Sequence, residues 1–111
     1  MKGTDNMILA NAFSLQMLDL TVGHNIRIAP LTIGEVRSLL AGGFTSAVGH
    51  PDTASVVGDI IGIDVPMNRI SVNLNKGMTL IVAQLTGGRL PEGATTLPEG
   101  FSIKFVKVEV L

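Results

Sequence analysis

The sequence predicts a single small domain of the α/β class, with α+β as the alternative, built on a mixed sheet of about five strands with flanking helices. Two observations point to this class: short apolar or alternating segments recur along the chain, and two segments with helical periodicity lie among them. The length of 111 residues suits one domain spanning positions 1–111. Because 46% of the residues are hydrophobic and 4% are aromatic, we expect an aliphatic core.

Two strands and a short turn are predicted at the start of the chain. Met7–Phe13 is a compact apolar run of the buried-strand type. It ends at Ser14, which can cap a short turn at Leu15–Leu18. His24–Ala29 alternates polar and apolar residues, as a half-exposed strand does, and Pro30 is expected to close it.

The first helix is predicted to begin at Thr32. Thr32 and Glu35 have the spacing of a capping box, in which each side chain bonds to the backbone amide of the other residue. Gly42 and Gly43 are expected to end this helix. Its apolar face consists of Ile33, Val36, Leu39 and Leu40.

A short strand at Phe44–Gly49 is predicted to lead into a second helix. His50 follows this strand directly and therefore lies at the helix N-terminus. Asp52 or Thr53 is expected to cap the helix. Its apolar stripe and its stop signal comprise Val56, Val57, Ile60, Ile61 and Gly62.

The second half of the chain predicts a hairpin and a last strand. Arg69–Asn75 alternates, and a turn through Lys76 and Gly77 leads into an apolar run at Met78–Gln84. A Gly/Pro-rich loop over Thr86–Gly100 contains Leu-Pro-Glu-Gly twice. Phe101–Val110 alternates again and is the last predicted strand.

Composition excludes several classes of function. Eight Lys and Arg against nine Asp and Glu give a net charge of −1, without the cationic surplus of proteins that bind long DNA or RNA. No apolar stretch approaches the roughly 18 residues of a membrane span. Residues 1–6, expected to be a flexible extension, do not resemble the start of a secretory signal. With no Cys in the chain, these features favour a cytoplasmic protein, in the host cytoplasm if it is viral.

The usual catalytic motifs are absent. The chain has neither a Gly-x-x-x-x-Gly-Lys-[Ser/Thr] phosphate loop nor a Gly-x-Ser-x-Gly elbow. Asp59 and Asp64 are a weak candidate for a metal pair, since one lies within the second helix and the other in its exit loop. We therefore expect no metal site and no cofactor.

His50 is the strongest candidate for chemistry among the two histidines. Small residues precede it, and Pro51 and a capping acid follow. A helix N-terminus favours a phosphate nearby, so an imidazole at that position is well placed to act on a bound anion. On residue type alone, a surface or structural histidine remains the more common case.

Four short motifs are distributed along the chain, and one of them contains His50. They occur in order, and the resemblance they carry runs from Met7 to Leu111. The motifs are Asn11-Ala12-Phe13-Ser14, Ala47-Val48-Gly49-His50, Asn68-Arg69 and Arg89-Leu90-Pro91-Glu92-Gly93. The set resembles the ring nuclease family, which comprises viral anti-CRISPR proteins directed against type III systems and relatives in bacterial and archaeal CRISPR loci.

The resemblance implies an activity and a set of site residues. Ring nucleases degrade cyclic tetra-adenylate, the second messenger of type III CRISPR defence. His50 would be the catalytic residue, with Glu92 assisting near the reacting sugar. The implied ligand-binding residues are Asn11, Ser14, Arg69, Gln84 and Arg89.

Plain structural roles stay open for several of these residues. Asn11 and Ser14 also suit the end of a strand and the cap of a turn. Arg69 suits a solvated cation at the start of a strand. Arg89 and Glu92 suit a surface ion pair, which would contribute little to stability.

Such an enzyme needs no metal ion, because the 2′-hydroxyl of the substrate can attack the adjacent phosphorus and leave a 2′,3′-cyclic phosphate. The symmetry of the cyclic ligand matches two identical protein surfaces, so we expect a C2 homodimer that releases linear di-adenylates. The main rival is a non-catalytic sponge or sensor that keeps the pocket without cutting. A DNA-binding regulator fits poorly with the net charge.

Overall fold

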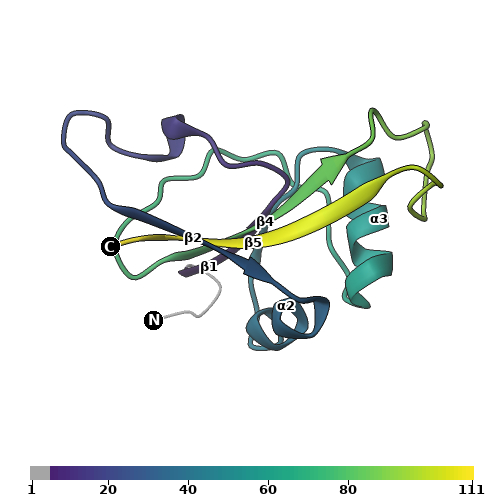
Figure 1. The fold of residues 1–111 in the computed structure, drawn as a ribbon, viewed down its shortest axis with the longest axis horizontal. Coiled ribbons are helices and arrows are strands. Elements are labelled where there is room, and N and C mark those ends of the chain that lie inside the picture. The colour runs from purple at the N-terminus through teal and green to yellow at the C-terminus, as the bar shows by residue number, and fades with distance from the viewer. Residues whose placement is uncertain (1–5) are drawn as a thin grey trace.

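One mixed sheet organises the chain. The computed structural model describes residues 6–111, which form a five-stranded sheet, two α-helices and one short 3-10 helix (Figure 1). The elements in chain order are β1 (Met7–Ala10), the 3-10 helix η1 (Leu15–Met17), β2 (Ile26–Leu31), α2 (Ile33–Leu40), β3 (Thr45–Ala47), α3 (Pro51–Ile61), β4 (Thr79–Thr86) and β5 (Ser102–Val110). The predicted single domain with a mixed sheet is confirmed, in its α+β form. The extension expected at residues 1–6 falls almost wholly outside the described residues.

The sheet has the strand order β2-β5-β4-β1-β3. Strand β1 runs parallel to both β3 and β4, whereas β5 runs antiparallel to both β4 and β2. Strand β4 is therefore paired on both sides, with Thr79 opposite Met7 of β1 and also opposite Glu109 of β5. The parallel strands β1, β3 and β4 all direct their carboxyl ends toward the same end of the sheet.

Both α-helices pack into the core on one face of the sheet. Figure 1 shows α2 beneath the sheet and α3 near the end where β4 and β5 lead into their connecting loop. The buried residues of this face come from three strands and both helices and their flanks: Leu9, Val36, Leu40, Val48, Ala54, Val57, Ile61, Val65, Ile81, Ala83 and Phe105. The aliphatic core that composition predicts is confirmed, because Phe105 is the one aromatic residue among them.

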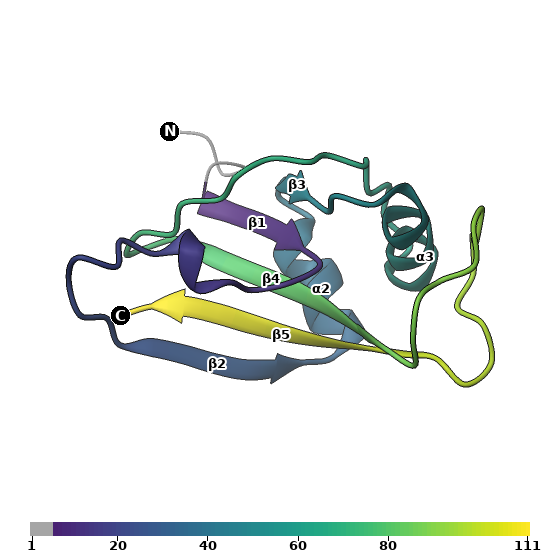
Figure 2. The same cartoon turned by 90° about the horizontal axis from the view of Figure 1, so that it is seen from above.

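The other face is covered by irregular chain. The connections at residues 11–25 and 62–78 cross this face (Figure 2). They contribute Leu18, Val72 and Leu74 to a second buried cluster, together with Ile8, Ala10, Leu80, Val82, Val108 and Val110 of the strands. Alternate residues of β1, β4 and β5 thus face two separate apolar layers, as the pleat of a strand requires.

The strand predicted at Arg69–Asn75 is wrong, and so is the hairpin with Met78–Gln84. This segment is extended, but it has no place in the sheet because both edges of β4 are already taken by β1 and β5. Its alternation arises because Val72 and Leu74 are buried on the sheet face while their neighbours are exposed. The amide of Leu74 donates to the carbonyl of Met17 at 2.7 Å, so its backbone partner is η1.

The first helix begins as predicted. The Thr32 amide donates to Glu35 Oε1 at 2.8 Å, and the Glu35 amide donates to Thr32 Oγ1 at 3.1 Å, which completes the capping box. The hydrogen bond from the Thr32 amide to the Glu35 carboxylate, and after it the interaction of that carboxylate with the Thr32 hydroxyl, hold the pKa of the Glu35 carboxyl below its ordinary value. Within the described residues, no helix has the length and hydropathy needed to cross a bilayer.

Two boundaries differ from the predictions for local reasons. Pro30 lies inside β2 and does not close it, because β2 is an edge strand that needs hydrogen bonds on one side only. The N-cap of α3 is His50, and neither Asp52 nor Thr53 has that position. Proline is favoured at the first helical position, so α3 begins at Pro51, earlier in the chain than a cap at Asp52 or Thr53 would allow.

Candidate functional site

A pocket of about 760 Å3 opens at the carboxyl ends of the parallel strands. This is the end of an open sheet at which α/β proteins usually bind ligands, since helix N-termini and loops gather there. The lining residues come from the ends of β1 and β4, the first turn of α3 and the loop after β4: Asn11, His50, Asp52, Thr53, Gln84, Leu85, Gly88, Arg89, Leu90 and Glu92.

His50 is presented by the junction between β3 and α3. Its backbone is extended, with φ −127° and ψ 131°, which is the conformation that a residue before proline prefers. The carbonyl of His50 accepts the first bond of the helix, from the Ala54 amide at 3.0 Å. The imidazole makes no capping hydrogen bond to α3, and the residue is exposed. The predicted placement of His50 at a helix N-terminus is confirmed, and the ring takes no part in capping that helix.

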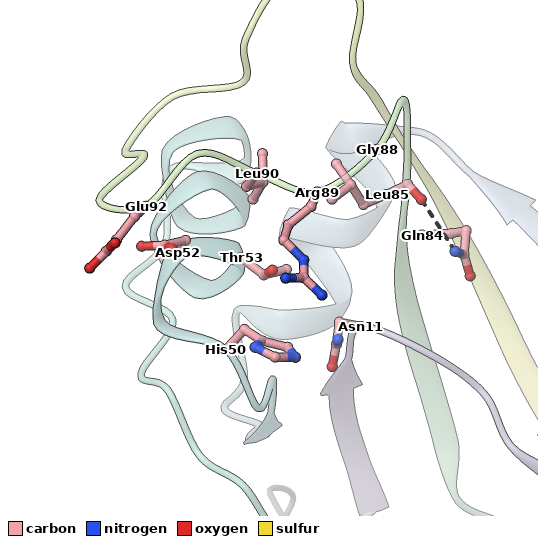
Figure 3. Close-up of a pocket in the computed structure, with 10 residues that line it drawn as sticks. All are labelled: Asn11, His50, Asp52, Thr53, Gln84, Leu85, Gly88, Arg89, Leu90 and Glu92. Atoms are coloured by element: carbon pink, nitrogen blue, oxygen red, sulfur yellow. Dashed lines mark hydrogen bonds between the residues drawn. The ribbon is translucent and has the colours of Figure 1, made fainter.

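Three polar side chains converge in the pocket. Figure 3 shows the guanidinium of Arg89 pointing toward the His50 ring and the Asn11 amide, with Thr53 beside it. Asn11 directly follows β1, so the three groups come from a strand end, a helix start and the loop after β4. An anion held between them would meet the N-terminus of α3 as well.

Gln84 and Glu92 lie at opposite margins of the same pocket. Gln84 is exposed on β4, and its Nε2 donates to the Leu85 carbonyl at 3.3 Å. The Glu92 carboxylate points outward, away from the His50 ring (Figure 3). Among residues 6–111 the ion pair found within 4.0 Å joins Lys107 and Glu109, so the surface pair considered for Arg89 and Glu92 is not formed.

Ser14 and Arg69 lie outside this pocket. Ser14 is the N-cap of η1, where its Oγ accepts from the Gln16 amide at 3.2 Å, so the capped turn expected there is confirmed. Arg69 donates from Nε and Nη2 to the Gly49 carbonyl, at 3.3 and 3.1 Å. Of the seven residues that the resemblance selects, the fold gathers the other five.

Like Thr53, Asp52 is a polar lining residue that the sequence motifs did not select for the site. Its Oδ1 accepts from the Gly93 amide at 3.1 Å and so ties the first turn of α3 to the loop after β4. Leu90 of that loop is buried, whereas Arg89 and Glu92 beside it are exposed. The position of Asp52, two residues after His50, could have identified it as a pocket residue. Nothing in the sequence predicts its hydrogen bond with the Gly93 amide.

The charge in the pocket comes from one arginine, two carboxylates and the helix N-terminus. The carboxyl groups whose pKa is clearly lowered, Asp19 and Glu35, lie elsewhere; for Asp19 the main cause is the hydrogen bond from the Thr21 hydroxyl. In the described part of the chain, no group of three or more His, Cys, Asp or Glu side chains is arranged to hold a metal ion.

Comparisons with known proteins identify similar viral proteins. The model of the STIV B116-like family matches residues 7–104. Uncharacterized protein 26 of Sulfolobus islandicus filamentous virus (isolate Iceland/Hveragerdi) is 39% identical over 83 residues, which cover 74% of this chain and 64% of that protein. The structure of B116 of Sulfolobus turreted icosahedral virus superposes with a TM-score of 0.75 at 26% identity, over 94% of this chain and 98% of B116.

Proposed function

The chain belongs to the STIV B116-like family, and from that membership and its pocket we propose that it is a metal-independent ring nuclease acting on cyclic tetra-adenylate. The observation that carries the proposal is the convergence of His50, Arg89 and Asn11 at the N-terminus of α3 (Figure 3). By destroying the second messenger, the enzyme would switch off type III CRISPR defence. The viral relatives agree with such a role in infection.

The pocket suits a nucleotide phosphate. Its volume of about 760 Å3 lies within the range of roughly 300–1,000 Å3 that is usual for small-ligand sites. The first amides of α3 and the guanidinium of Arg89 offer complementary ways to bind phosphate oxygens. Asn11 and Gln84 add amide groups that can hydrogen-bond to an adenine or a ribose.

The proposed reaction uses the substrate's own nucleophile. The 2′-hydroxyl loses its proton to solvent as its oxygen attacks the adjacent phosphorus in line, and the bond to the 5′-oxygen breaks to leave a 2′,3′-cyclic phosphate. His50 gives a proton to the departing 5′-oxygen, and Arg89 stabilises the charge that develops on the phosphorane. Because the His50 ring is exposed and not used in capping α3, its nitrogens are available to the ligand.

A C2 homodimer is part of the proposal. Cyclic tetra-adenylate carries four phosphates, whereas one pocket supplies a single arginine, Arg89. Two pockets related by a two-fold axis would supply two arginines and two His50 rings to opposite linkages of the ring. Two cuts would then release linear di-adenylates.

The decisive test is single-turnover cleavage of cyclic tetra-adenylate by His50→Ala. We expect the rate to fall by at least roughly 10²-fold with ligand affinity within about tenfold, since His50 is proposed to transfer a proton and not to bind. His50→Gln should not restore the rate. His24→Ala is the matched control, because the other histidine of the chain bonds to the Asp19 carbonyl and does not line the pocket.

The outcomes separate the proposal from its main rival. Wild-type cleavage by a folded His50→Ala variant would refute the role of His50. Intact ligand held tightly by the wild-type protein would instead identify a non-catalytic sponge or sensor. Circular dichroism of each variant shows whether a loss of activity reflects the site or the fold.

A further inference from the structure

A tight turn in the loop after β4 carries Glu92. The Ala94 amide donates to the Pro91 carbonyl at 3.1 Å and closes the turn. Gly93, at the third position, has φ +80°, and Glu92 before it has a negative φ, so the turn is of type II, in which the third position favours glycine. The closing bond does not use the Gly93 amide. The turn therefore offers one N–H group to another part of the fold.

Asp52 of α3 accepts a hydrogen bond from that group. Its Oδ1 lies 3.1 Å from the Gly93 amide nitrogen. The amide belongs to the peptide bond between Glu92 and Gly93, so the carboxylate fixes the peptide plane next to the Glu92 Cα. Asp52 is the second residue of α3 and stands two positions after His50. One side chain therefore connects the start of the helix that presents His50 to the turn that carries Glu92.

This bond joins the two elements that bring His50 and Arg89 together. Figure 3 shows the Arg89 guanidinium pointing toward the His50 ring. The two residues come from the start of α3 and from the loop after β4, which both lie outside the sheet. Leu90 holds the loop by apolar burial, whereas the bond between Asp52 and Gly93 links the loop to α3 directly. The spacing of the two proposed catalytic groups therefore depends on this bond.

We propose that Asp52 is a positioning residue that sets the place of Arg89 and Glu92 relative to His50 through the Gly93 amide; the proposal rests on the ring nuclease function argued above. A misplacement of about 1 Å at a reacting group can cost on the order of 10²-fold in rate. A carboxylate in the first turn also stabilises a helix through its charge, so the test has to separate the hydrogen bond from the charge.

The test compares Asp52→Ala with Asp52→Asn. Both variants remove the charge, but Asn keeps an Oδ1 that can accept from the Gly93 amide. Asp52→Ala should lower single-turnover cleavage of cyclic tetra-adenylate at least about tenfold, and Asp52→Asn should restore most of the rate. In the Arg89→Ala background the loss caused by Asp52→Ala should be much smaller, because the bond acts through the loop that carries that arginine. Asp59→Ala is the matched control, since it removes an exposed acid of the same helix that does not line the pocket.

Amide hydrogen exchange of the free protein gives a readout that does not depend on cleavage. The Gly93 amide should exchange about tenfold faster in Asp52→Ala, as expected for the loss of a hydrogen bond to a charged group, and close to the wild-type rate in Asp52→Asn. The Ala94 amide bonds within the turn, so its exchange should change much less. This difference distinguishes release of the turn from α3 from unfolding of the turn itself.

Three results would overturn the proposal: unchanged Gly93 exchange in Asp52→Ala, equal loss of cleavage in the Ala and Asn variants, or wild-type cleavage by Asp52→Ala. Equal loss in the two variants would mean that the charge of Asp52 matters and its hydrogen bond does not. If the wild-type protein cleaves no cyclic tetra-adenylate, the proposed function fails, and Gly93 exchange still decides whether Asp52 holds the loop.

Discussion

Leu90 is the apolar anchor of the loop that carries Arg89 and Glu92. Its side chain is 8% exposed, while Arg89, Pro91 and Glu92 around it are exposed. Leu90→Ala removes three carbons at about 0.8 kcal/mol each, so the closed loop should lose about 2 kcal/mol relative to a detached one. At 1.4 kcal/mol for each factor of ten, the detached fraction should rise about 30-fold.

Amide hydrogen exchange measures this detachment directly. The Gly93 amide donates to Asp52 Oδ1 of α3, so it is protected only while the loop is closed. We expect it to exchange about 30-fold faster in Leu90→Ala, and single-turnover cleavage to fall because Arg89 is no longer held at the pocket.

The duplicated Leu-Pro-Glu-Gly motif supplies a matched control within the same loop. Leu97 occupies the equivalent place in the second copy, is only half-buried and does not line the pocket. Leu97→Ala should therefore change Gly93 exchange and cleavage much less than Leu90→Ala. If Leu97→Ala has the larger effect, or if Leu90→Ala leaves Gly93 exchange unchanged, Leu90 does not anchor the loop.

Three further predictions follow from the site and the first helix. Glu92→Gln should slow cleavage while Glu99→Gln, the same change in the second motif copy, should leave the rate within about twofold; equal effects of the two variants would remove Glu92 from the site. Cleavage should persist in EDTA, and a loss of activity that added divalent metal restores would contradict the metal-independent reaction. Thr32→Ala should lower Tm by roughly 5 °C at neutral pH, because it removes the acceptor for the Glu35 amide. The pKa of Glu35 is lowered in the folded state, first by the Thr32 amide and then by the Thr32 hydroxyl, so its contribution to stability is present above its unfolded pKa and is lost as pH falls through the folded pKa. Thr32→Ala removes only the hydroxyl, so a thermal melt series should show the part of its effect that comes from the hydroxyl and the carboxylate shrinking below about pH 4 and the part that comes from the Glu35 amide persisting.

The sequence predicted the helices better than the strands, and the reason is physical. Helix signals such as the Thr32 and Glu35 capping box involve residues close together in the sequence, so they form independently of how distant segments pack. Alternation reports only that one side of a segment is buried. At Val72 and Leu74 that burial is against a face of the sheet, and no pattern in the segment distinguishes this from a place within the sheet.

The sequence predicted most of the residues that form the site, but it did not predict which groups they contact. Motif resemblance selected His50 and Arg89, and the fold brings both to one pocket. It also selected Arg69, whose side chain bonds to the Gly49 carbonyl. The bond between Asp52 and Gly93 spans 41 positions, and which loop approaches a helix start depends on strand order, which local sequence does not encode.

The strand order also determines when during synthesis the sheet can form. Strand β2 pairs only with β5, and β4 uses β5 as one of its two neighbours, so most of the ladder waits for residues 102–110 to leave the ribosome. Until then β1 can pair in parallel with β3 over three residue pairs and with β4 over four, which leaves β2 and one side of β4 without a neighbour. Before residues 102–110 are available, the nascent chain must therefore carry β2 unpaired and β4 paired on one side, a state in which aggregation competes with folding.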